Sequence, residues 1–220
     1  MTDGNIVKVS GSRGSSNCYI VENGADAVII DPGADYRAIV DGLSNLTPKA
    51  VLATHGHFDH VLHVAKLKRE YGIPFYLHGS DKKLVKQVNL YLHLSKRTDF
   101  VEVPTVDVCI DDAHTLDLAF VQIAVLHTPG HTAGSVCYAF DDNLFTGDVL
   151  MKNSVGRTDL PGGDADAIAR SLKRIAGAIG DMRVFPGHFA NTTLNEERQF
   201  NSRLMSILGS DDLRRAGTSR

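Results

Sequence analysis

The chain has 220 residues, of which 43% are hydrophobic and 22% are charged, and this composition is typical of a soluble globular protein with one sizeable core. Its net charge of -3 gives no electrostatic case for binding nucleic acid or an anionic membrane, and no apolar run approaches the roughly 18 residues that a membrane span needs. We therefore expect a single domain over residues 1–220, with neither nucleic acid nor a membrane as its partner.

The N-terminal residues and the cysteines bear on the compartment. Residues 1–5 lack the basic start and the apolar stretch of a secretory signal. Cys18, Cys109 and Cys137 are widely spaced, odd in number and form no Cys-x-x-Cys motif, which favours reduced thiols. We expect a cytoplasmic protein.

The first half of the chain predicts strands separated by polar turns and followed by helices. The expected strands are 6–9, 18–21, 27–30, 50–53 and 75–78, and the expected helices are 35–43, 59–71 and 81–96. The helix over 59–71 should end at Gly72, because glycine adopts the left-handed conformation that closes many helices. The helix over 81–96 has two open interpretations: it covers the mouth of a site and helps to select substrate, or it is a plain amphipathic helix with solvated lysines.

The second half repeats this organisation. Its expected strands are 106–110, 120–126, 135–140, 143–145 and 182–185, and its expected helices are 165–178 and 194–208. Antiparallel strand clusters, each with helices over one face, would bury their apolar faces by packing the two sheets together. We predict an α+β fold, a four-layer αββα sandwich, with the functional site along one edge.

Residues 55–60 read His-Gly-His-Phe-Asp-His, directly after an apolar run of strand length. No packed core requires four metal-binding side chains within six residues. Neutral imidazoles and a carboxylate are the ligands that zinc or iron takes in proteins. The cluster stands between a strand and a helix, where a rigid scaffold presents chemistry to solvent.

Three further potential ligands, His131, Asp148 and His188, each follow a short apolar run and have a glycine nearby. A single histidine is usually structural, but this spacing makes a structural accident improbable. The complete set is His55, His57, Asp59, His60, His131, Asp148 and His188. One tetrahedral zinc takes about four ligands, so seven indicate two metal ions.

Several longer motifs surround these residues. They are Asn-Cys-Tyr-Ile-Val at 17–21, Ile-Asp-Pro-Gly-Ala-Asp at 30–35, Thr-Pro-Gly-His-Thr-Ala-Gly-Ser at 128–135, Phe-Thr-Gly-Asp at 145–148, Ser-Val-Gly-Arg-Thr-Asp-Leu-Pro-Gly-Gly at 154–163, Pro-Gly-His at 186–188 and Thr-Thr-Leu-Asn-Glu-Glu-Arg at 192–198. With these motifs the chain resembles the metallo-β-lactamase superfamily nearly end to end. Within that superfamily it looks like the glyoxalase II-like hydrolases, to which the Gly-Arg-Thr-Asp-Leu-Pro-Gly-Gly segment at 156–163 points.

The resemblance implies a role for each ligand. His55, His57 and His131 would hold a first metal, Asp59, His60 and His188 a second, and Asp148 would bridge the two. The metals would be two divalent ions, zinc first, with iron or manganese as alternatives. Asp59 and Asp148 would orient a metal-bridging hydroxide, since metal binding brings the pKa of water from about 15.7 toward 7. The implied reaction is hydrolysis of a small acyl thioester, such as S-lactoylglutathione.

Two residues near the ligands have open roles. Asp31 either accepts the far N–H of a ligand histidine, which fixes its tautomer, or merely caps the turn before Pro32. His63 stands three residues after His60, so it either approaches the metal ligands or packs as an ordinary helix residue.

Substrate recognition is less defined. Arg157 falls where related enzymes place a basic residue, and it either grips a substrate carboxylate or pairs with Asp159 or Asp164. Only 32 residues follow His188, which leaves little room for the C-terminal helical part that clamps glutathione in full glyoxalase II enzymes. We expect glutathione to be held more loosely, or the acyl donor to differ.

Other reactions use the same scaffold. Persulfide dioxygenases hold a single iron, and the corresponding ligands in this chain would be His55, His131 and Asp148. Those enzymes carry Phe-Gln where this chain has Leu160-Pro161, which argues against this alternative. Lactonases share all seven ligands and stay open. Three further alternatives rank below the dioxygenase and the lactonase. They are β-lactam hydrolysis, RNA processing and a purely structural metal site.

Overall fold

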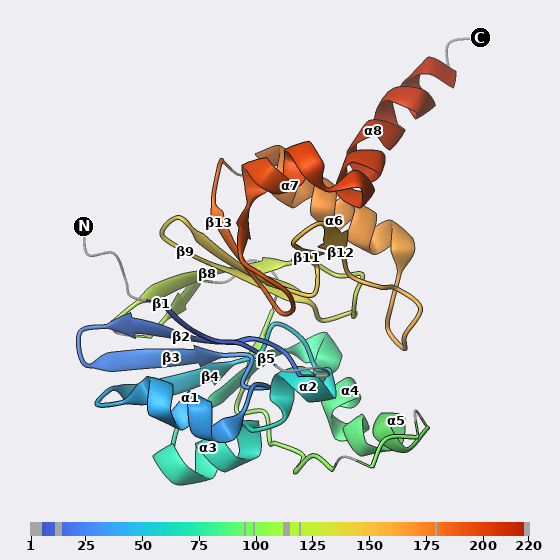
Figure 1. The fold of residues 1–220 in the computed structure, drawn as a ribbon. Helices are drawn as coiled ribbons and strands as arrows, with labels where there is room; N and C mark the ends of the chain where they lie inside the picture. The colour runs from blue at the N-terminus through green and yellow to red at the C-terminus, as the bar shows by residue number, and fades with distance from the viewer. Residues whose placement is uncertain are drawn as a thin grey trace.

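The computed structural model describes residues 6–11, 15–94, 96–98, 100–111, 115–118, 120–178 and 180–217. Two six-stranded sheets pack against each other (Figure 1). The first has the order β1-β2-β3-β4-β5-β6, formed by β1 (Ile6–Val9), β2 (Cys18–Asn23), β3 (Asp26–Ile30), β4 (Thr47–Leu52), β5 (Phe75–His78) and β6 (Val108–Ile110). The second has the order β14-β13-β10-β9-β8-β7, formed by β7 (Thr115–Asp117), β8 (Gln122–His127), β9 (Val136–Phe140), β10 (Asn143–Gly147), β13 (Arg183–Pro186) and β14 (Thr192–Thr193). A separate pair joins β11 (Leu150–Met151) to β12 (Ser154–Val155).

Helices cover the outer face of each sheet. They are α1 (Tyr36–Leu43), α2 (Phe58–Val61), α3 (Val64–Tyr71), the 3-10 helix η1 (Gly79–Asp81), α4 (Lys82–Lys86), α5 (Val88–Leu94), α6 (Ala165–Ala178), α7 (Leu194–Phe200) and α8 (Ser202–Gly217). In Figure 1, α1 and α3 lie below the first sheet, while α6 and α7 lie above the second. Among the described residues, no helix is both long and apolar enough to cross a lipid bilayer.

The structure has four layers: helices, the first sheet, the second sheet and helices. Three apolar clusters lie between successive layers. Strand β2 contributes to two of them, because neighbouring side chains on a strand point to opposite faces. Its Cys18 and Ile20 pack against the helices outside the first sheet, whereas Tyr19 and Val21 pack between the two sheets. A third apolar cluster joins the second sheet to α6, α7 and α8. The predicted α+β sandwich is therefore confirmed.

The expected antiparallel pairing is wrong for part of each sheet. Strands β3, β4, β5 and β6 are mutually parallel, and β10 is parallel to β13. A helix lies between the members of each parallel pair along the chain, such as α1 between β3 and β4. A helical crossover returns the chain to the same end of the sheet, so the next strand runs in the same direction.

Three helices predicted as continuous are interrupted. The helix over 59–71 is divided into α2 and α3, although Gly72 closes α3 in the left-handed conformation as expected. The helix over 81–96 becomes η1, α4 and α5, with a break at Gln87. The helix over 194–208 breaks at Asn201, where the backbone is extended. The two- and three-residue strands β7, β11, β12 and β14 were not predicted, because such short segments carry no periodicity.

Candidate metal centre

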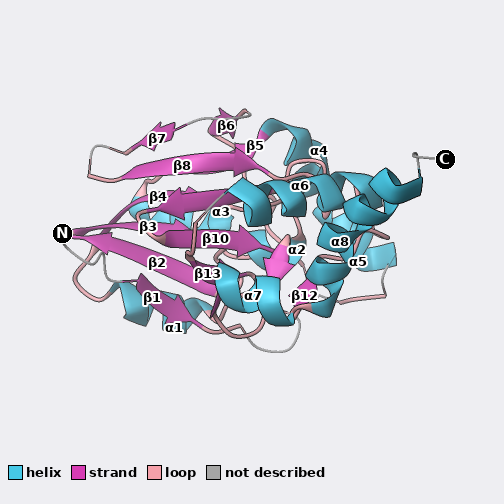
Figure 2. Cartoon of the chain, turned by 90° about the horizontal axis from the view of Figure 1, so that it is seen from above, coloured by secondary structure: helices cyan, strands magenta, loops and turns pink. Residues whose placement is uncertain are grey.

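Strand direction brings three of the predicted ligands to one edge. Strand β9 is antiparallel to both β8 and β10, and β10 is parallel to β13, so β8, β10 and β13 all run the same way. In Figure 2, β8 and β10 point toward the end of the molecule where α2 and α4 lie. His131, Asp148 and His188 follow the carboxyl ends of these strands, and residues 55–60 follow β4 of the other sheet. The structure thus gathers all seven predicted ligands.

A first group consists of three imidazoles. Nε2 of His55 and Nε2 of His131 each lie 3.0 Å from Nδ1 of His57. Two ligands of one tetrahedral zinc lie about 3.3 Å apart, given zinc–nitrogen distances near 2.05 Å. The three nitrogens therefore have the spacing of atoms that share one ion.

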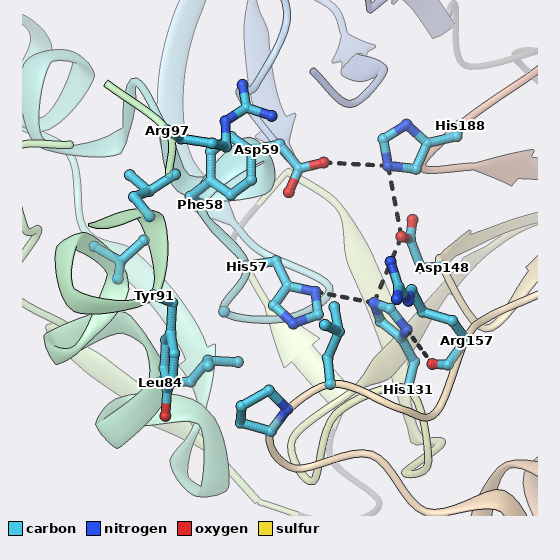
Figure 3. Close-up of a pocket in the computed structure, with 15 residues that line it drawn as sticks. His57, Phe58, Asp59, Leu84, Tyr91, Arg97, His131, Asp148, Arg157 and His188 are labelled. Atoms are coloured by element: carbon cyan, nitrogen blue, oxygen red, sulfur yellow. Dashed lines mark hydrogen bonds and ion pairs between the residues drawn. The ribbon is translucent and has the colours of Figure 1, made fainter. Parts of the chain in front are cut away.

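A second group consists of Asp59, His60 and His188, whose ligand atoms all lie within 4.8 Å of one another. Nε2 of His188 is 3.2 Å from Asp59 Oδ2. Asp148 lies between the groups, because its Oδ2 is 3.5 Å from Nε2 of His131 and 3.5 Å from Nε2 of His188. Figure 3 shows this carboxylate between the two imidazoles.

The hydrogen bonds behind the imidazoles fix their tautomers. His131 Nδ1 donates to the backbone carbonyl of Arg157 at 2.8 Å. The hydroxyl of Thr54 donates to Asp31, so its oxygen accepts from Nδ1 of His55 at 3.1 Å. Both rings then carry their protons on the far nitrogen, and their Nε2 lone pairs both point at His57. A shared cation satisfies such converging lone pairs.

Two buried atoms point to the same conclusion for the second group. Within the part of the chain that the structure describes, His60 Nε2 and Asp148 Oδ1 are buried without a hydrogen-bond partner. They lie 3.4 Å apart. Because a buried polar atom without a partner costs about 1–3 kcal/mol, the donor set fits a metal at this position.

In the first group and at Asp148 the electrostatics agree with ligand chemistry, which requires neutral imidazoles and ionised carboxylates. In the second group the neighbouring carboxylates instead raise the pKa values of His60 and His188, although burial acts to lower them. Burial, together with the imidazole of His131, lowers the pKa of His57 to about 3. Burial and the neighbouring imidazoles also hold the pKa of His55 well below 6.5. Although burial acts to raise it, the imidazoles of His60, His131 and His188 hold the pKa of the Asp148 carboxyl below its ordinary value.

Asp31 lies behind His60. Its Oδ2 is 2.9 Å from His60 Nδ1, and its two oxygens accept from the backbone N–H and the hydroxyl of Thr54, each at 2.7 Å. The carboxylate thus contacts the far nitrogen of His60, which is the first of its two predicted roles, and it ties the loop after β4 to the end of β3. Asp31 itself has a left-handed backbone, with φ of 51°.

Asp81 was not predicted, and it joins the two loops that carry the first group. Its carboxylate accepts from the backbone N–H of Gly56 at 2.8 Å, the hydroxyl of Thr132 at 2.7 Å and the backbone N–H of Gly134 at 2.8 Å. Asp81 is 1% exposed. A β-carbon on Gly134 would lie 2.7 Å from this carboxylate, so only glycine fits there.

The loop that carries His188 is held from the first sheet. The amide of Asn17 donates to the carbonyl of Pro186 at 2.9 Å, and the hydroxyl of Tyr19 donates to the same carbonyl at 2.6 Å. A side chain at Gly187 would collide with Asp148 and His60. The Asn-Cys-Tyr and Pro-Gly-His motifs therefore meet in space and position His188.

A cavity of about 290 Å³ opens over the ligands (Figure 3). Its floor includes His57, Asp59, His131, Asp148 and His188. The other side is mostly apolar and is formed by Phe58, Leu84, Val88, Tyr91, Leu92, Leu160 and Pro161. Residues of the segment predicted over 81–96 therefore line the site, as its first interpretation expected, whereas a role in selecting substrate stays a prediction.

Arg157 also lines this cavity, but its guanidinium is paired. It donates from Nε and from a terminal nitrogen to the two oxygens of Asp159, each at 2.7 Å. This is the salt bridge that the alternative interpretation expected, and substrate binding by Arg157 stays a prediction. His63 packs edge-on against Tyr36, with ring centroids 5.3 Å apart, as an ordinary packing residue would.

Comparison with known proteins gives consistent matches. A family model described as the metallo-beta-lactamase superfamily matches residues 11–188. Hydroxyacylglutathione hydrolase GloC from Haemophilus influenzae is 30% identical over 202 residues, covering 86% of this chain and 93% of that protein. The structure of BLEG-1 B3 metallo-beta-lactamase is similar with a TM-score of 0.84 and 33% identity, covering 91% of this chain and 99% of that one. TTHA1623 in a di-iron-bound form has a TM-score of 0.77 and 37% identity, covering 86% of this chain and 94% of that one.

Proposed function

Because the chain belongs to the metallo-beta-lactamase superfamily, we propose that it is a dinuclear metal-dependent hydrolase of small acyl thioesters, similar to glyoxalase II. The observation that carries this proposal is the pair of ligand groups joined by Asp148. His55, His57 and His131 would hold one ion, and Asp59, His60 and His188 the other. We propose zinc, while the di-iron form of TTHA1623 keeps iron as an alternative.

Bound divalent cations supply Lewis acidity that activates water at neutral pH and polarises a carbonyl oxygen. The protein's own part is to position water and substrate. Asp59 and Asp148 face the same space in Figure 3, so their carboxylates are placed to accept hydrogen bonds from a water and to orient its attack. Asp31 and the Arg157 carbonyl hold the imidazoles of His60 and His131 in fixed orientations.

A thioester suits this site for two reasons. A thiolate with a parent pKa near 8.5 leaves without prior protonation, so a general acid is not needed. The similarity to hydroxyacylglutathione hydrolase GloC over most of both chains also supports a thioester substrate.

The test is a hydrolysis screen on protein whose metal content has been measured. We expect turnover of S-lactoylglutathione or simple acyl thioesters, loss of turnover after chelation and recovery when zinc is restored. Hydrolysis of lactones alone would contradict the thioester assignment. Oxygen uptake with glutathione persulfide on iron-loaded protein would instead indicate a dioxygenase.

A second candidate is hydrolysis of β-lactams. The similarity to BLEG-1 at 33% identity favours it, since that protein is a B3 metallo-beta-lactamase. A chromogenic cephalosporin in the same screen separates the two. A higher kcat/KM for the cephalosporin than for every thioester would favour the β-lactamase.

A further inference from the structure

The apolar side of the cavity is a fixed part of the fold. Val88 and Leu92, on α5, are 3% and 2% exposed and form a small core with Val101. Phe58 and Leu62 pack against this core. The guanidinium carbon of Arg97 lies 4.6 Å from the centroid of the Phe58 ring. The wall therefore packs on a small buried cluster of its own.

Arg97 and Arg157 line the cavity beside this wall, and the guanidinium of each already has a contact within the protein. The Arg157 guanidinium is paired with Asp159, and that of Arg97 lies against Phe58. Burying a carboxylate without a dedicated partner is costly, whereas burying methylene groups is favourable. The wall thus distinguishes an apolar group from a charged one.

The cavity continues into a more polar space. A second cavity of about 230 Å³ shares Leu84, Tyr91 and Pro161 with the first and is also lined by Lys83 and Gln87. A long acyl arm can therefore run from the metal ligands along the apolar wall, with its far end near this polar rim. The thiol carrier lies on the other side of the scissile C–S bond, so it would extend toward solvent and not along the wall.

Building on the proposed function, we propose that the preferred thioesters carry an apolar acyl arm, which packs against the wall formed by Phe58, Leu84, Val88, Leu92, Leu160 and Pro161. The polar thiol carrier, on the other side of the scissile bond, extends toward solvent and contributes less to selection. The specificity is thereby set by the acyl chain and not by the carboxylates of glutathione.

The experiment measures kcat/KM for acetyl, butyryl, hexanoyl and octanoyl thioesters of one thiol, with zinc-loaded protein. We expect kcat/KM to rise by up to about fourfold per added methylene until the cavity is filled. Leu84→Asn should flatten this series, and Leu84→Met should retain it. The matched control is Leu90→Asn, because Leu90 lies on α5, is 51% exposed and does not line the cavity.

A binding measurement separates the failure of this inference from the failure of the proposed function. The thermal unfolding midpoint of the zinc-loaded protein is recorded with acetate, butyrate, hexanoate and octanoate, the carboxylate products of the same series. We expect the midpoint to rise with chain length in the parent protein and in Leu90→Asn but not in Leu84→Asn. That variant's own midpoint without ligand shows whether it is folded.

The outcomes are distinct. If thioester turnover and the carboxylate-induced midpoint shift are both independent of chain length, the apolar arm is overturned and the hydrolase stands. Carboxylate binding that increases with length and depends on Leu84, in a protein that hydrolyses no thioester, supports the wall and overturns the proposed reaction. Equal responses of Leu84→Asn and Leu90→Asn overturn the role given to Leu84.

Discussion

At the scale of single residues, Asp81 positions the ligands of the first group although it is not one of the ligands itself. Its three hydrogen bonds reach Gly56, between His55 and His57, and Thr132 and Gly134, just after His131. The two loops that carry the first group are therefore tied to the same buried carboxylate. Loss of a residue that orients ligands typically lowers metal affinity by about 10- to 100-fold.

We predict that Asp81→Ala weakens binding of one metal by about 10- to 100-fold while the second binds almost normally. The reason is that two backbone N–H groups lose their acceptor and the loops of the first group are released. Competition with a chromophoric chelator measures both affinities. Asp41→Ala removes an exposed carboxylate from α1 and should change neither. Equal affinities in Asp81→Ala and the parent protein would contradict this role.

Asp59 belongs to the other group, so its removal should have the complementary effect. Asp59→Ala is expected to lower the metal content toward one ion and to reduce turnover on the order of 100-fold, because Asp59 both ligates and orients water. Elemental analysis and thioester hydrolysis on the same sample give the two values. A preparation of Asp59→Ala with two metals and normal turnover would show that the proposed mechanism is wrong.

At the scale of elements, the break between α7 and α8 rests on contacts distant in the sequence. Asn201 is fully buried, accepts from the backbone N–H of Leu204 at 3.1 Å and donates to the carbonyl of Ser154 at 3.0 Å. A helix predicted over 194–208 therefore stops and restarts at one side chain, whose partner lies 47 residues away.

Asn201→Ala should lower the free energy of unfolding by about 1–3 kcal/mol, because a helix cap is lost and a part-buried carbonyl loses its donor. Urea unfolding of metal-free protein, followed by circular dichroism, measures this difference. Ser206→Ala, at an exposed position on α8, should be neutral or slightly stabilising. If both variants changed the free energy of unfolding equally, the hydrogen bonds of Asn201 would make no measurable contribution to stability.

The sequence could predict features that a local pattern marks, but not features that depend on partners distant along the chain. The ligands were recognisable because each stands directly after an apolar run, so the local pattern carries the signal. Asp81, the parallel pairing of β3 to β6 and the break at Asn201 depend on partners brought together only by folding. No periodicity marks Asp81, whose hydrogen-bond donors Gly56 and Thr132 lie 25 and 51 residues away along the chain. The single-domain boundary over residues 1–220 stays a prediction.

At the scale of the whole molecule, the proposed metals connect the two halves of the sandwich. His55, His57, Asp59 and His60 follow β4 of the first sheet, whereas His131, Asp148 and His188 follow strands of the second. Each ligand group takes side chains from both sheets. Ions held by these groups would therefore bind the folded chain more tightly than the unfolded one, in which only residues 55–60 stay close together.

Zinc should consequently stabilise the fold. With free zinc at about 100 times the dissociation constant, one site adds about 2.7 kcal/mol to the free energy of unfolding. We expect the urea midpoint to rise on adding zinc to chelator-treated protein, and to rise less in Asp59→Ala, which lacks one ligand of the second group. Magnesium, which prefers oxygen ligands, should have little effect on this histidine-rich set and serves as the control. Superimposable unfolding curves with and without zinc would mean that the seven side chains do not hold a metal in the folded protein, and the hydrolase would lose its physical basis.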